Sequence, residues 1–309
     1  MRIASIDIGT NTVLLLIAEI DHLGKILTLE HRQNFPRLGN YVDKNTSISL
    51  TAFDSVAGIL QDYKNIAYQF NADKIITCAT SAVRDAVNKI EFITYIKKVT
   101  DLEVEIISGD DEALLTYEGA ISGFSSIDTD KLIIDIGGGS TEIAYKTNQE
   151  FVAQSIQIGA VRLTERCFKK LPPADAEIEL AKTIIAQAYY QIEKFYPDHY
   201  ILIGVAGTVT TLACLEQGLM KFDAEKVSGY RLSIDRIHHW LKILFKMKPA
   251  EIRSLSDTTE GREDILPTGV LILYEFMKQF NFKQVVVSER GLRYGLVLRE
   301  YRKQRNKYR

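Results

Sequence analysis

Apolar and polar positions alternate along the chain with two periods, one typical of strands and one typical of helices. Short apolar runs end in polar turns near Ile8, Ala79 and Val205, and each run predicts a buried strand. Behind a suitable N-cap at Ser49 or Thr51, a stripe at helical spacing comprises Phe53, Val56, Ala57, Leu60, Ala67 and Phe70. Strands and helices interleave with few prolines and without a low-complexity linker, so the pattern predicts an α/β protein.

The same periodicity places the other elements of the first half. Two strands are expected between Arg2 and Glu30, and a short strand is expected from Glu103 to Ile107. Ser108 then caps a helix that ends at Ile121. This order of elements is typical of strands that are joined by crossover helices.

The length of the chain and one polar stretch predict two domains. At 309 residues the chain is long for a single hydrophobic core. Residues 122–130 are polar and contain glycine, which makes them the best domain boundary. We therefore expect an N-terminal domain over residues 1–124 and a C-terminal domain over residues 125–309.

A glycine-rich stretch at residues 132–145, with a shorter echo at residues 5–12, carries most of the chemical information. Both stretches consist of an apolar run, Asp, Ile and Gly, followed by small polar residues. Glycine has no Cβ, so successive backbone N–H groups can converge on a phosphate. The candidate phosphate-binding residues are Gly9, Thr10, Asn11 and Thr12 in the first loop and Gly137, Gly138, Gly139, Ser140 and Thr141 in the second. Two such loops predict a duplicated phosphate-binding domain, although an ordinary tight turn explains the first loop equally well.

A third candidate loop joins a buried strand directly to a helix. The strand Ile201–Val205 runs into Gly207 and Thr208, where the positive end of a helix dipole would face a phosphate. The first two loops differ from it, because Glu142–Tyr145 alternates like a strand and no Gly-Lys-Ser/Thr follows the glycines. They are therefore predicted as strand–turn–strand loops, which excludes a P-loop and a dinucleotide fingerprint.

Carboxylates stand beside both hairpin loops. A carboxylate does not bind a phosphate directly, so Asp7 and Asp135 at the ends of the two strands predict a divalent cation that bridges carboxylate and phosphate. Glu142 flanks the second loop on its other side. Magnesium, or manganese in its place, is the expected ion.

Composition narrows the class of protein. The net charge of −2 argues against a general nucleic-acid binder, and 46% hydrophobic residues are ordinary for a globular enzyme. Three scattered cysteines, Cys78, Cys167 and Cys214, lack metal-ligand spacing and predict reduced thiols in a cytoplasmic protein. We expect no signal peptide, no membrane span and no membrane partner. His238 and His239 are expected to pack on an amphipathic helix.

Glu112 and Arg84 each have both a structural and a functional interpretation. Asp110, Asp111 and Glu112 stand in the first turn of a predicted helix, where the dipole stabilises carboxylates without any function. Glu112 is not distinguished from its neighbours by this argument. Arg84 follows a strand end at the same sheet edge as the loops, so it is either a surface cation or a phosphate ligand.

An ordered set of motifs resembles one family, the exopolyphosphatase/guanosine pentaphosphate phosphohydrolase family. The motifs are Ile6–Thr12, Ala79–Arg84, Ile107–Ala113, Ile134–Glu142 and Gly204–Thr210, with smaller matches at Arg37–Gly39, Ile158–Glu165, Ser228–Ser233, Asp264–Pro267 and Val287–Arg293. Each motif alone is widespread, but the ordered set is specific and covers nearly the whole chain. The resemblance implies two related actin-like domains of the acetate kinase/heat-shock chaperone/actin type around a central cleft. A C-terminal helix, about residues 293–309, is expected to pack on the first domain.

The resemblance also implies roles for individual residues. Glu112 matches a general base that activates water, and Arg84 matches an arginine that meets phosphate oxygens. Asp135 and Glu142 match acidic residues around the divalent ion, and the three loops match phosphate-contacting loops. The implied activity is exopolyphosphatase, which hydrolyses the terminal phosphoanhydride of inorganic polyphosphate with Mg²⁺.

Three alternatives to that activity remain. Guanosine pentaphosphate is the other substrate that the resemblance implies, and the sequence displays no diagnostic purine pocket. Leu14 and Leu114 replace cations that are common in relatives, which keeps open a non-catalytic sensor of polyphosphate or an alarmone. The fold would also suit a sugar or acetate kinase. A homodimer is the base-rate expectation. The C-terminal tail is basic and is either a solvated helix end or a polyphosphate track. Its basic residues are Arg299, Arg302, Lys303, Arg305, Lys307 and Arg309.

Overall fold

The protein is described here by a computed structural model that covers residues 1–39, 47–124, 130–147, 150–192, 195 and 197–307. The chain forms two compact units, which are described separately. Unit 1 comprises Met1–Ser122 together with Leu292–Arg309, and unit 2 comprises Gly123–Gly291. Residue 125, where the second domain was predicted to begin, and Arg309 of the basic tail lie outside the described residues.

Unit 1 is built on a five-stranded mixed sheet. Its strand order is β3-β2-β1-β4-β5, in which β1 pairs antiparallel with β2 and parallel with β4. The strands are β1 (Arg2–Ile8), β2 (Val13–Ile20), β3 (Ile26–Asn34), β4 (Lys74–Ala79) and β5 (Val104–Ile106). Because β1, β4 and β5 are parallel, their carboxyl ends lie at one edge of the sheet.

The prediction of two strands between Arg2 and Glu30 is wrong, because a third strand, β3, begins at Ile26. β3 lies at the edge of the sheet and pairs only with β2 among the described strands. Most of its side chains are at least partly exposed. An edge strand of this kind lacks the continuous apolar run by which buried strands are recognised.

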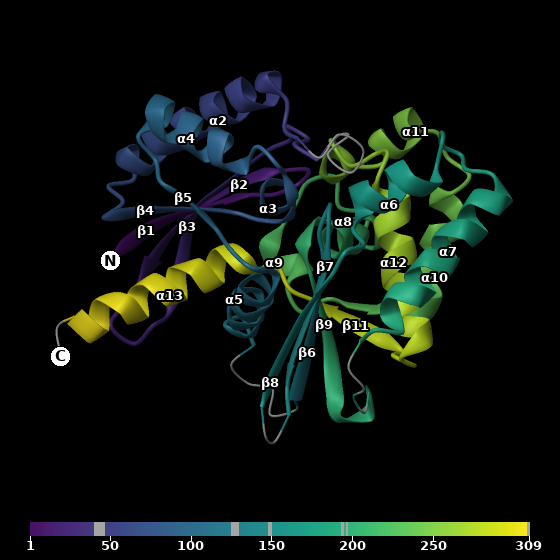
Figure 1. The fold of residues 1–309 in the computed structure, drawn as a ribbon. Helices are drawn as coiled ribbons and strands as arrows, with labels where there is room; N and C mark the ends of the chain where they lie inside the picture. Colours follow the sequence, from purple (N-terminus) through teal and green to yellow (C-terminus); the bar gives the residue numbers. More distant parts are fainter. Residues whose placement is uncertain (40–46, 125–129, 148–149, 193–194, 196, 308–309) are drawn as a thin grey trace. The chain divides into compact units, whose positions relative to one another are not determined.

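Helices cover both faces of this sheet (Figure 1). Side chains of the helices α2 and α4 pack with one face, and those of α5 and α13 pack with the other. The helices of unit 1 are α2 (Leu50–Gln69), α3 (Ser81–Asp85), α4 (Lys89–Thr100), α5 (Gly109–Ile121) and α13 (Leu292–Lys307). Ser49 and Ser108 cap α2 and α5 as predicted, since their side chains accept hydrogen bonds from Ala52 N and Asp111 N.

Unit 2 contains a six-stranded mixed sheet in the order β10-β11-β9-β6-β7-β8. Its strands are β6 (Asp130–Ile136), β7 (Thr141–Lys146), β8 (Phe151–Ile156), β9 (Tyr200–Val205), β10 (Arg231–Ser233) and β11 (Gln284–Val287). β6 pairs antiparallel with β7 and parallel with β9, and β9 is parallel to β11. The carboxyl ends of these three parallel strands therefore share one sheet edge.

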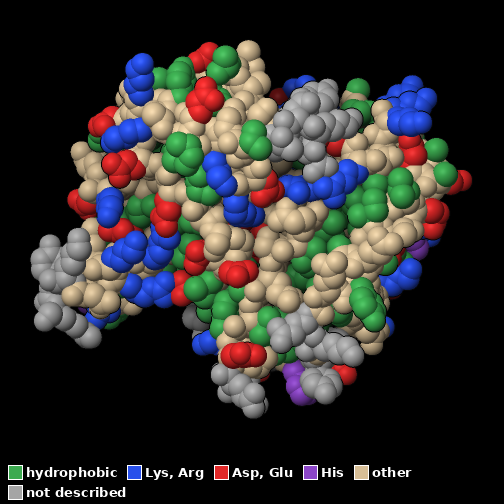
Figure 2. Space-filling model, viewed as in Figure 1, with side chains coloured by type: hydrophobic (Ala, Val, Ile, Leu, Met, Phe, Trp, Pro, Cys, Tyr) green, Lys and Arg blue, Asp and Glu red, His purple; other side chains and the backbone are tan. Residues whose placement is uncertain are grey.

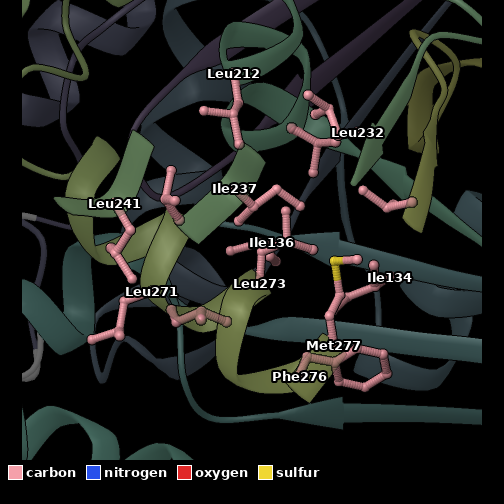
Figure 3. Packing of buried hydrophobic residues seen from close by; sticks show 14 of the residues in the cluster. Ile134, Ile136, Leu212, Leu232, Ile237, Leu241, Leu271, Leu273, Phe276 and Met277 are labelled. Atoms are coloured by element: carbon pink, nitrogen blue, oxygen red, sulfur yellow. The ribbon is translucent and has the colours of Figure 1, made fainter. Parts of the chain in front are cut away.

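The helices of unit 2 bury a large apolar core against this sheet. They are α6 (Ala160–Cys167), α7 (Asp175–Tyr189), α8 (Ala206–Glu216), α9 (Ala224–Val227), α10 (Ile234–Leu244), α11 (Pro249–Arg253) and α12 (Leu266–Gln279), with short 3₁₀ turns at Pro197–His199 and Asp257–Thr259. Figure 3 shows part of this core, with Ile134 and Ile136 of β6, Ile237 of α10 and Phe276 of α12. On α10, His238 stacks on the ring of Tyr274, which is the packing role expected for it.

The two units repeat one topology. The order β3-β2-β1-β4-β5 in unit 1 corresponds to β8-β7-β6-β9-β11 in unit 2, with the same parallel and antiparallel pairings. The predicted α/β class with two related halves is therefore confirmed. The three cysteines are free and buried. Among the described residues, no helix has the length and apolar character needed to cross a membrane.

Candidate functional site

The two predicted phosphate loops have the same geometry. Gly9 N donates to Thr12 O over 2.8 Å, and Gly137 N donates to Ser140 O over 3.0 Å. Each loop joins two antiparallel strands, with Ile8 paired to Val13 and Ile136 paired to Thr141. A Cβ on either glycine would lie within 3.2 Å of that carbonyl oxygen, so the turn favours glycine. Both loops are thus strand–turn–strand loops, as predicted.

Each loop is held in place by a glycine-containing segment that follows it in the sequence. Backbone N–H groups of that segment donate hydrogen bonds to the carbonyl oxygens of the loop, and these bonds are called the clamp of the loop. In unit 2, Ala160 N donates to Gly137 O, and Val161 N donates to Gly138 O over 2.8 Å. In unit 1, Gly39 N donates to Thr10 O over 2.7 Å. A Cβ on Gly159 would come within 2.5 Å of Gly138. These contacts explain two of the smaller motifs, Arg37–Gly39 and Ile158–Glu165, as supports of the loops.

The clamps leave backbone donors available in both loops. In the described part of the chain, the N–H groups of Gly138, Gly139, Thr10 and Thr12 donate to no carbonyl group. Consecutive N–H groups in such a turn form a concavity that attracts anions. Thr141 has a different place, because it is fully buried and its hydroxyl donates to Ile158 O over 2.7 Å.

Asp135 and Glu142 are brought together by strand pairing. They are directly opposite each other in the β6–β7 ladder, and opposed residues present their side chains on the same face. Glu142 is only 2% exposed and accepts a 2.7 Å hydrogen bond from Ser155 Oγ on β8. Asp7 occupies the place of Asp135 in unit 1, where its partner across the ladder is Leu14. Leu14, which replaces a cation that is common in relatives, is therefore the counterpart of Glu142 in unit 1.

The carboxylate pair of unit 2 suits a magnesium ion chemically. Mg²⁺ is usually held by one or two carboxylates, several waters and phosphate oxygens, so a complete protein cage is not required. Among the described residues, no three His, Cys, Asp or Glu side chains form a group that could hold a metal. Asp135 and Glu142, with one carboxylate fixed by Ser155, are the residues that would hold the ion in unit 2.

The third predicted loop begins α8 at the end of β9. Ala206, its first residue, has a positive φ of 68°, an uncommon conformation for a residue with a side chain. The absence of a side chain at Gly207 leaves room for the guanidinium of Arg262, since a Cβ on Gly207 would lie 2.5 Å from Arg262 Cζ. Burial lowers the pKa of Arg262 to about 10, so the group is charged at neutral pH. Thr208 is buried and packs against Gly269 of α12.

Arg262 is a candidate that the sequence motifs did not single out. It lies outside the described helices and strands, in the segment before α12, and meets Gly207 only through tertiary packing. In the sequence, the position of Arg262 just before the motif Asp264–Pro267 is the feature that could have indicated its role. A charged guanidinium beside the first turn of a helix adds a cation to the predicted third phosphate loop.

In unit 1, Glu112 and Arg84 form an ion pair. Arg84 Nη1 lies 2.9 Å from Glu112 Oε2 and also donates to Ile107 O over 3.1 Å. Both side chains are largely buried, with 17% and 10% of their surfaces exposed. Arg84 Nη2 is buried and has no hydrogen-bond partner among the described residues. Burying an unpaired donor is unfavourable, so this atom suits an anionic ligand oxygen.

The acidic residues near Glu112 behave as the dipole interpretation requires. Asp110 and Asp111 are exposed, and Asp111 Oδ2 accepts a hydrogen bond from the cap residue Ser108. Glu112 alone of the three is buried, at 8% exposure. The structure therefore separates Glu112 from its neighbours, which the sequence pattern did not do.

A buried cysteine relates Glu112 to the first loop. Cys78 pairs with Asp7 between the parallel strands β4 and β1. Burial raises the pKa of the Cys78 thiol well above its usual value, and the negative charges of Asp7 and Glu112 raise it further. Asp7, Glu112 and Arg84 thus lie around the carboxyl ends of β1 and β4 in unit 1.

Part of the basic C-terminal tail is engaged in packing. Arg299 pairs with Glu105 through two hydrogen bonds, and Arg302 pairs with Glu118 of α5. Arg305 stacks on the ring of Tyr301. Figure 2 shows Lys and Arg side chains interleaved with Asp and Glu over this part of unit 1. These pairings favour a docked helix end over an open polyphosphate track.

Comparisons with known proteins agree on one family. The model of the Ppx/GppA phosphatase family matches residues 16–304. The chain is 34% identical over 307 residues to a bifunctional 3-dehydroquinate synthase/phosphatase of Fusobacterium nucleatum, of which it covers 46%. It is 29% identical over 311 residues to Exopolyphosphatase 2 of Mycobacterium tuberculosis, and these cover 96% of this chain and 98% of that protein.

A third relative carries a different activity in its name, and solved structures share the fold. Guanosine-5'-triphosphate,3'-diphosphate pyrophosphatase of Aeromonas salmonicida is 26% identical over 95% of this chain and 58% of its own length. The Ppx/GppA family member from Aquifex aeolicus has a TM-score of 0.82 at 29% identity, with 98% of both chains covered. An exopolyphosphatase from Cytophaga hutchinsonii has a TM-score of 0.87 at 29% identity, with 96% of both covered.

Proposed function

Because the chain belongs to the Ppx/GppA phosphatase family, we propose that it is a phosphoanhydride hydrolase whose substrate is inorganic polyphosphate. The observation that carries the proposal is the buried pair of Arg84 and Glu112. One guanidinium nitrogen contacts the carboxylate, and the other is buried without a hydrogen-bond partner among the described residues. Exopolyphosphatase 2 of Mycobacterium tuberculosis matches this chain over nearly the full length of both proteins, which supports polyphosphate as the substrate.

Glu112 is the proposed general base of unit 1. The 2.9 Å contact with Arg84 holds the Glu112 carboxylate, the group that would accept a proton, in one place. Glu112 orients a water and takes its proton as the water oxygen attacks the terminal phosphorus. The new O–P bond forms while the bridging P–O bond breaks, so orthophosphate and a polyphosphate shorter by one unit are released. Arg84 Nη2 donates to a phosphate oxygen and offsets the negative charge of the transition state.

The loops of both units bind phosphate oxygens in this proposal. The donors are the N–H groups of Thr10, Thr12, Gly138 and Gly139, which donate to no carbonyl group of the described residues. The hydrogen bonds to the loop carbonyls would fix these donors before the ligand binds. In unit 2, Arg262 beside Gly207 adds positive charge near the start of α8. Because the donors are fixed in advance, the loops are not reorganised when the substrate binds.

Asp135 and Glu142 are the proposed ligands of Mg²⁺ or Mn²⁺ in unit 2, and Asp7 is the corresponding carboxylate of unit 1. A bound divalent ion would neutralise phosphate charge and polarise the phosphoryl oxygens. The residues themselves contribute a fixed geometry, since Ser155 Oγ holds one oxygen of Glu142.

Guanosine pentaphosphate is the second candidate substrate, because a relative named for guanosine-5'-triphosphate,3'-diphosphate aligns with 95% of this chain. The same base and the same loops would act on its 5′-terminal phosphate. For the protein as a whole we propose a cytoplasmic location, to which three free cysteines are suited. We propose a homodimer on the base rate for soluble enzymes, and no nucleic-acid or membrane partner.

Phosphate release by the purified protein tests this proposal. Short and long polyphosphate, guanosine pentaphosphate and ATP are each supplied with Mg²⁺, with Mn²⁺ and with a chelator. We expect release from polyphosphate that depends on the metal. Binding of polyphosphate without any release would favour the sensor, and phosphate transfer from ATP to an acceptor would favour the kinase.

A further inference from the structure

Helix α13 of unit 1 lies directly against helix α5 at Gly295. A Cβ on Gly295 would lie 2.0 Å from the carbonyl oxygen of Leu115 and 2.6 Å from its carbonyl carbon. Gly295 is buried. Real Cβ atoms do not come this close to backbone, so any side chain at position 295 must push the two helices apart.

α13 is held to the sheet on its other side. Arg293 Nη1 donates to Leu15 O of β2 over 2.9 Å, and Ser5 Oγ of β1 donates to Arg293 O over 3.0 Å. The hydroxyl of Tyr294 lies 2.9 Å from Thr28 Oγ1 of β3. Since these contacts join α13 to three strands, an overlap at Gly295 would be relieved by movement of α5. The motif Val287–Arg293 and the two residues after it are thereby explained as the start of a docked helix.

α5 carries Glu112 one helical turn before Leu115. The partner of Glu112 is anchored elsewhere. Arg84 Nη1 donates to Ile107 O, and Lys89 Nζ donates to Arg84 O over 3.0 Å. A shift of α5 therefore moves Glu112 relative to Arg84 rather than moving both together. One small buried cluster contains Cys78 of β4, Leu115 of α5, and Leu292 and Leu296 of α13, so the contact between the two helices also packs against β4.

We propose that Gly295 is a positioning residue for Glu112, and this inference rests on the proposed role of Glu112 as general base. The absence of a side chain at position 295 lets α5 approach α13 closely enough to set the 2.9 Å contact between Glu112 and Arg84. Glu112 is thus placed by a residue that is distant in sequence and does not touch the ligand.

Gly295→Ala is the test, and Gly58→Ala is its matched control. In the described part of the chain, nothing lies within 4 Å of a Cβ on Gly58, which stands in helix α2 of the same unit. We expect Gly295→Ala to lower kcat for phosphate release about 10- to 100-fold, because misplacement by about 1 Å can cost a catalytic group that much. KM for polyphosphate is expected to stay within about threefold and the control to match the wild type, since the binding groups are not moved.

A double variant separates positioning from a general loss of structure. If Gly295 acts through Glu112, adding Gly295→Ala to Glu112→Gln leaves the residual rate unchanged, because the group being positioned is already absent. An equal fold-loss in both backgrounds, or an unchanged kcat in Gly295→Ala alone, overturns the inference. Full activity of Glu112→Gln overturns the proposed function instead.

Leu115→Ala carries the test if Gly295→Ala does not fold. It removes the side chain that packs at the same crossing without introducing an overlap. We expect kcat to fall roughly threefold to tenfold because α5 is less firmly placed, and we expect this loss to vanish in the Glu112→Gln background. Persistence of the same loss in that background counts against the inference.

Discussion

Arg84 Nη1 lies 2.9 Å from Glu112 Oε2 and 3.1 Å from the carbonyl oxygen of Ile107, so one guanidinium nitrogen joins the proposed base to the end of β5. The other terminal nitrogen, Nη2, is buried and has no hydrogen-bond partner among the described residues. A planar guanidinium makes these contacts through one nitrogen and presents a second nitrogen to a ligand, whereas an ammonium group carries all its donors on a single nitrogen. Arg84 is therefore suited to hold the Glu112 carboxylate and a phosphate at the same time.

Arg84→Lys is expected to lower kcat/KM about 10- to 100-fold, because the lysine ammonium cannot replace the forked hydrogen bonds. Steady-state kinetics of phosphate release measure the effect. Arg32→Lys is the matched control, since Arg32 is 54% exposed and pairs only with Glu30 among the described residues. Equal activity of Arg84→Lys and Arg32→Lys would remove Arg84 from the site.

Glu142→Gln is expected to raise the Mg²⁺ concentration needed for half-maximal activity by at least about tenfold, because a neutral amide is a weaker ligand than a carboxylate. A titration of activity with Mg²⁺ measures the shift. Glu150→Gln, an exposed change in the same unit, is the control. If the two titration curves coincide, Glu142 does not hold the metal.

Gly159→Ala is expected to lower kcat/KM about 10- to 100-fold, because the new methyl group would overlap Gly138 and displace the loop donors. Isothermal titration with phosphate or short polyphosphate should show weaker binding, in contrast to Gly295→Ala. Unchanged affinity would show that the Gly137–Thr141 loop does not bind the ligand.

The stability of unit 2 is expected to depend on Glu216 at neutral pH but not in acid. A hydrogen bond from Arg236, aided by one from Trp240, lowers the pKa of Glu216 below the usual 4.5. A lowered pKa in the folded state stabilises the fold above the ordinary pKa of Glu, and this contribution is lost as the pH falls through the folded-state value. Arg236 is half exposed, so solvent screening limits the contribution to about 1 kcal/mol or less.

Thermal unfolding of Glu216→Gln measures this effect. The Tm of the variant should lie below that of the wild type at pH 7, and the two Tm values should converge as the pH falls below the ordinary 4.5 and through the lowered pKa of the folded state. Glu225→Gln is the control, because Glu225 is exposed in the same unit. A Tm difference that persists unchanged into acid would assign the effect to packing rather than to charge.

Local sequence signals predicted the loops and their supporting strands. The glycines after Asp7 and Asp135 specify tight turns, and Ser108 specifies the start of the helix that carries Glu112. β3 was missed because its side chains are half exposed and follow no apolar run. Local periodicity thus identifies elements that are buried or capped, and it is weak for edge strands.

Contacts between segments that are distant in the sequence could not be predicted from local sequence patterns. The approach of Arg262 to Gly207 and of Gly295 to Leu115 joins segments separated by more than fifty residues. Neither contact leaves a periodic or capping signal. The burial that distinguishes Glu112 from Asp110 and Asp111 likewise follows from packing, since all three are equally suited to a first helical turn.

The most direct test of the account compares Glu112→Gln with Asp110→Asn, an exposed acid in the same helical turn, for turnover and for binding of polyphosphate. We predict that Glu112→Gln loses about 10²- to 10⁴-fold in kcat, because the general base is removed, while it binds polyphosphate like the wild type. Asp110→Asn should keep full activity. Undiminished phosphate release by Glu112→Gln would contradict the account at its centre.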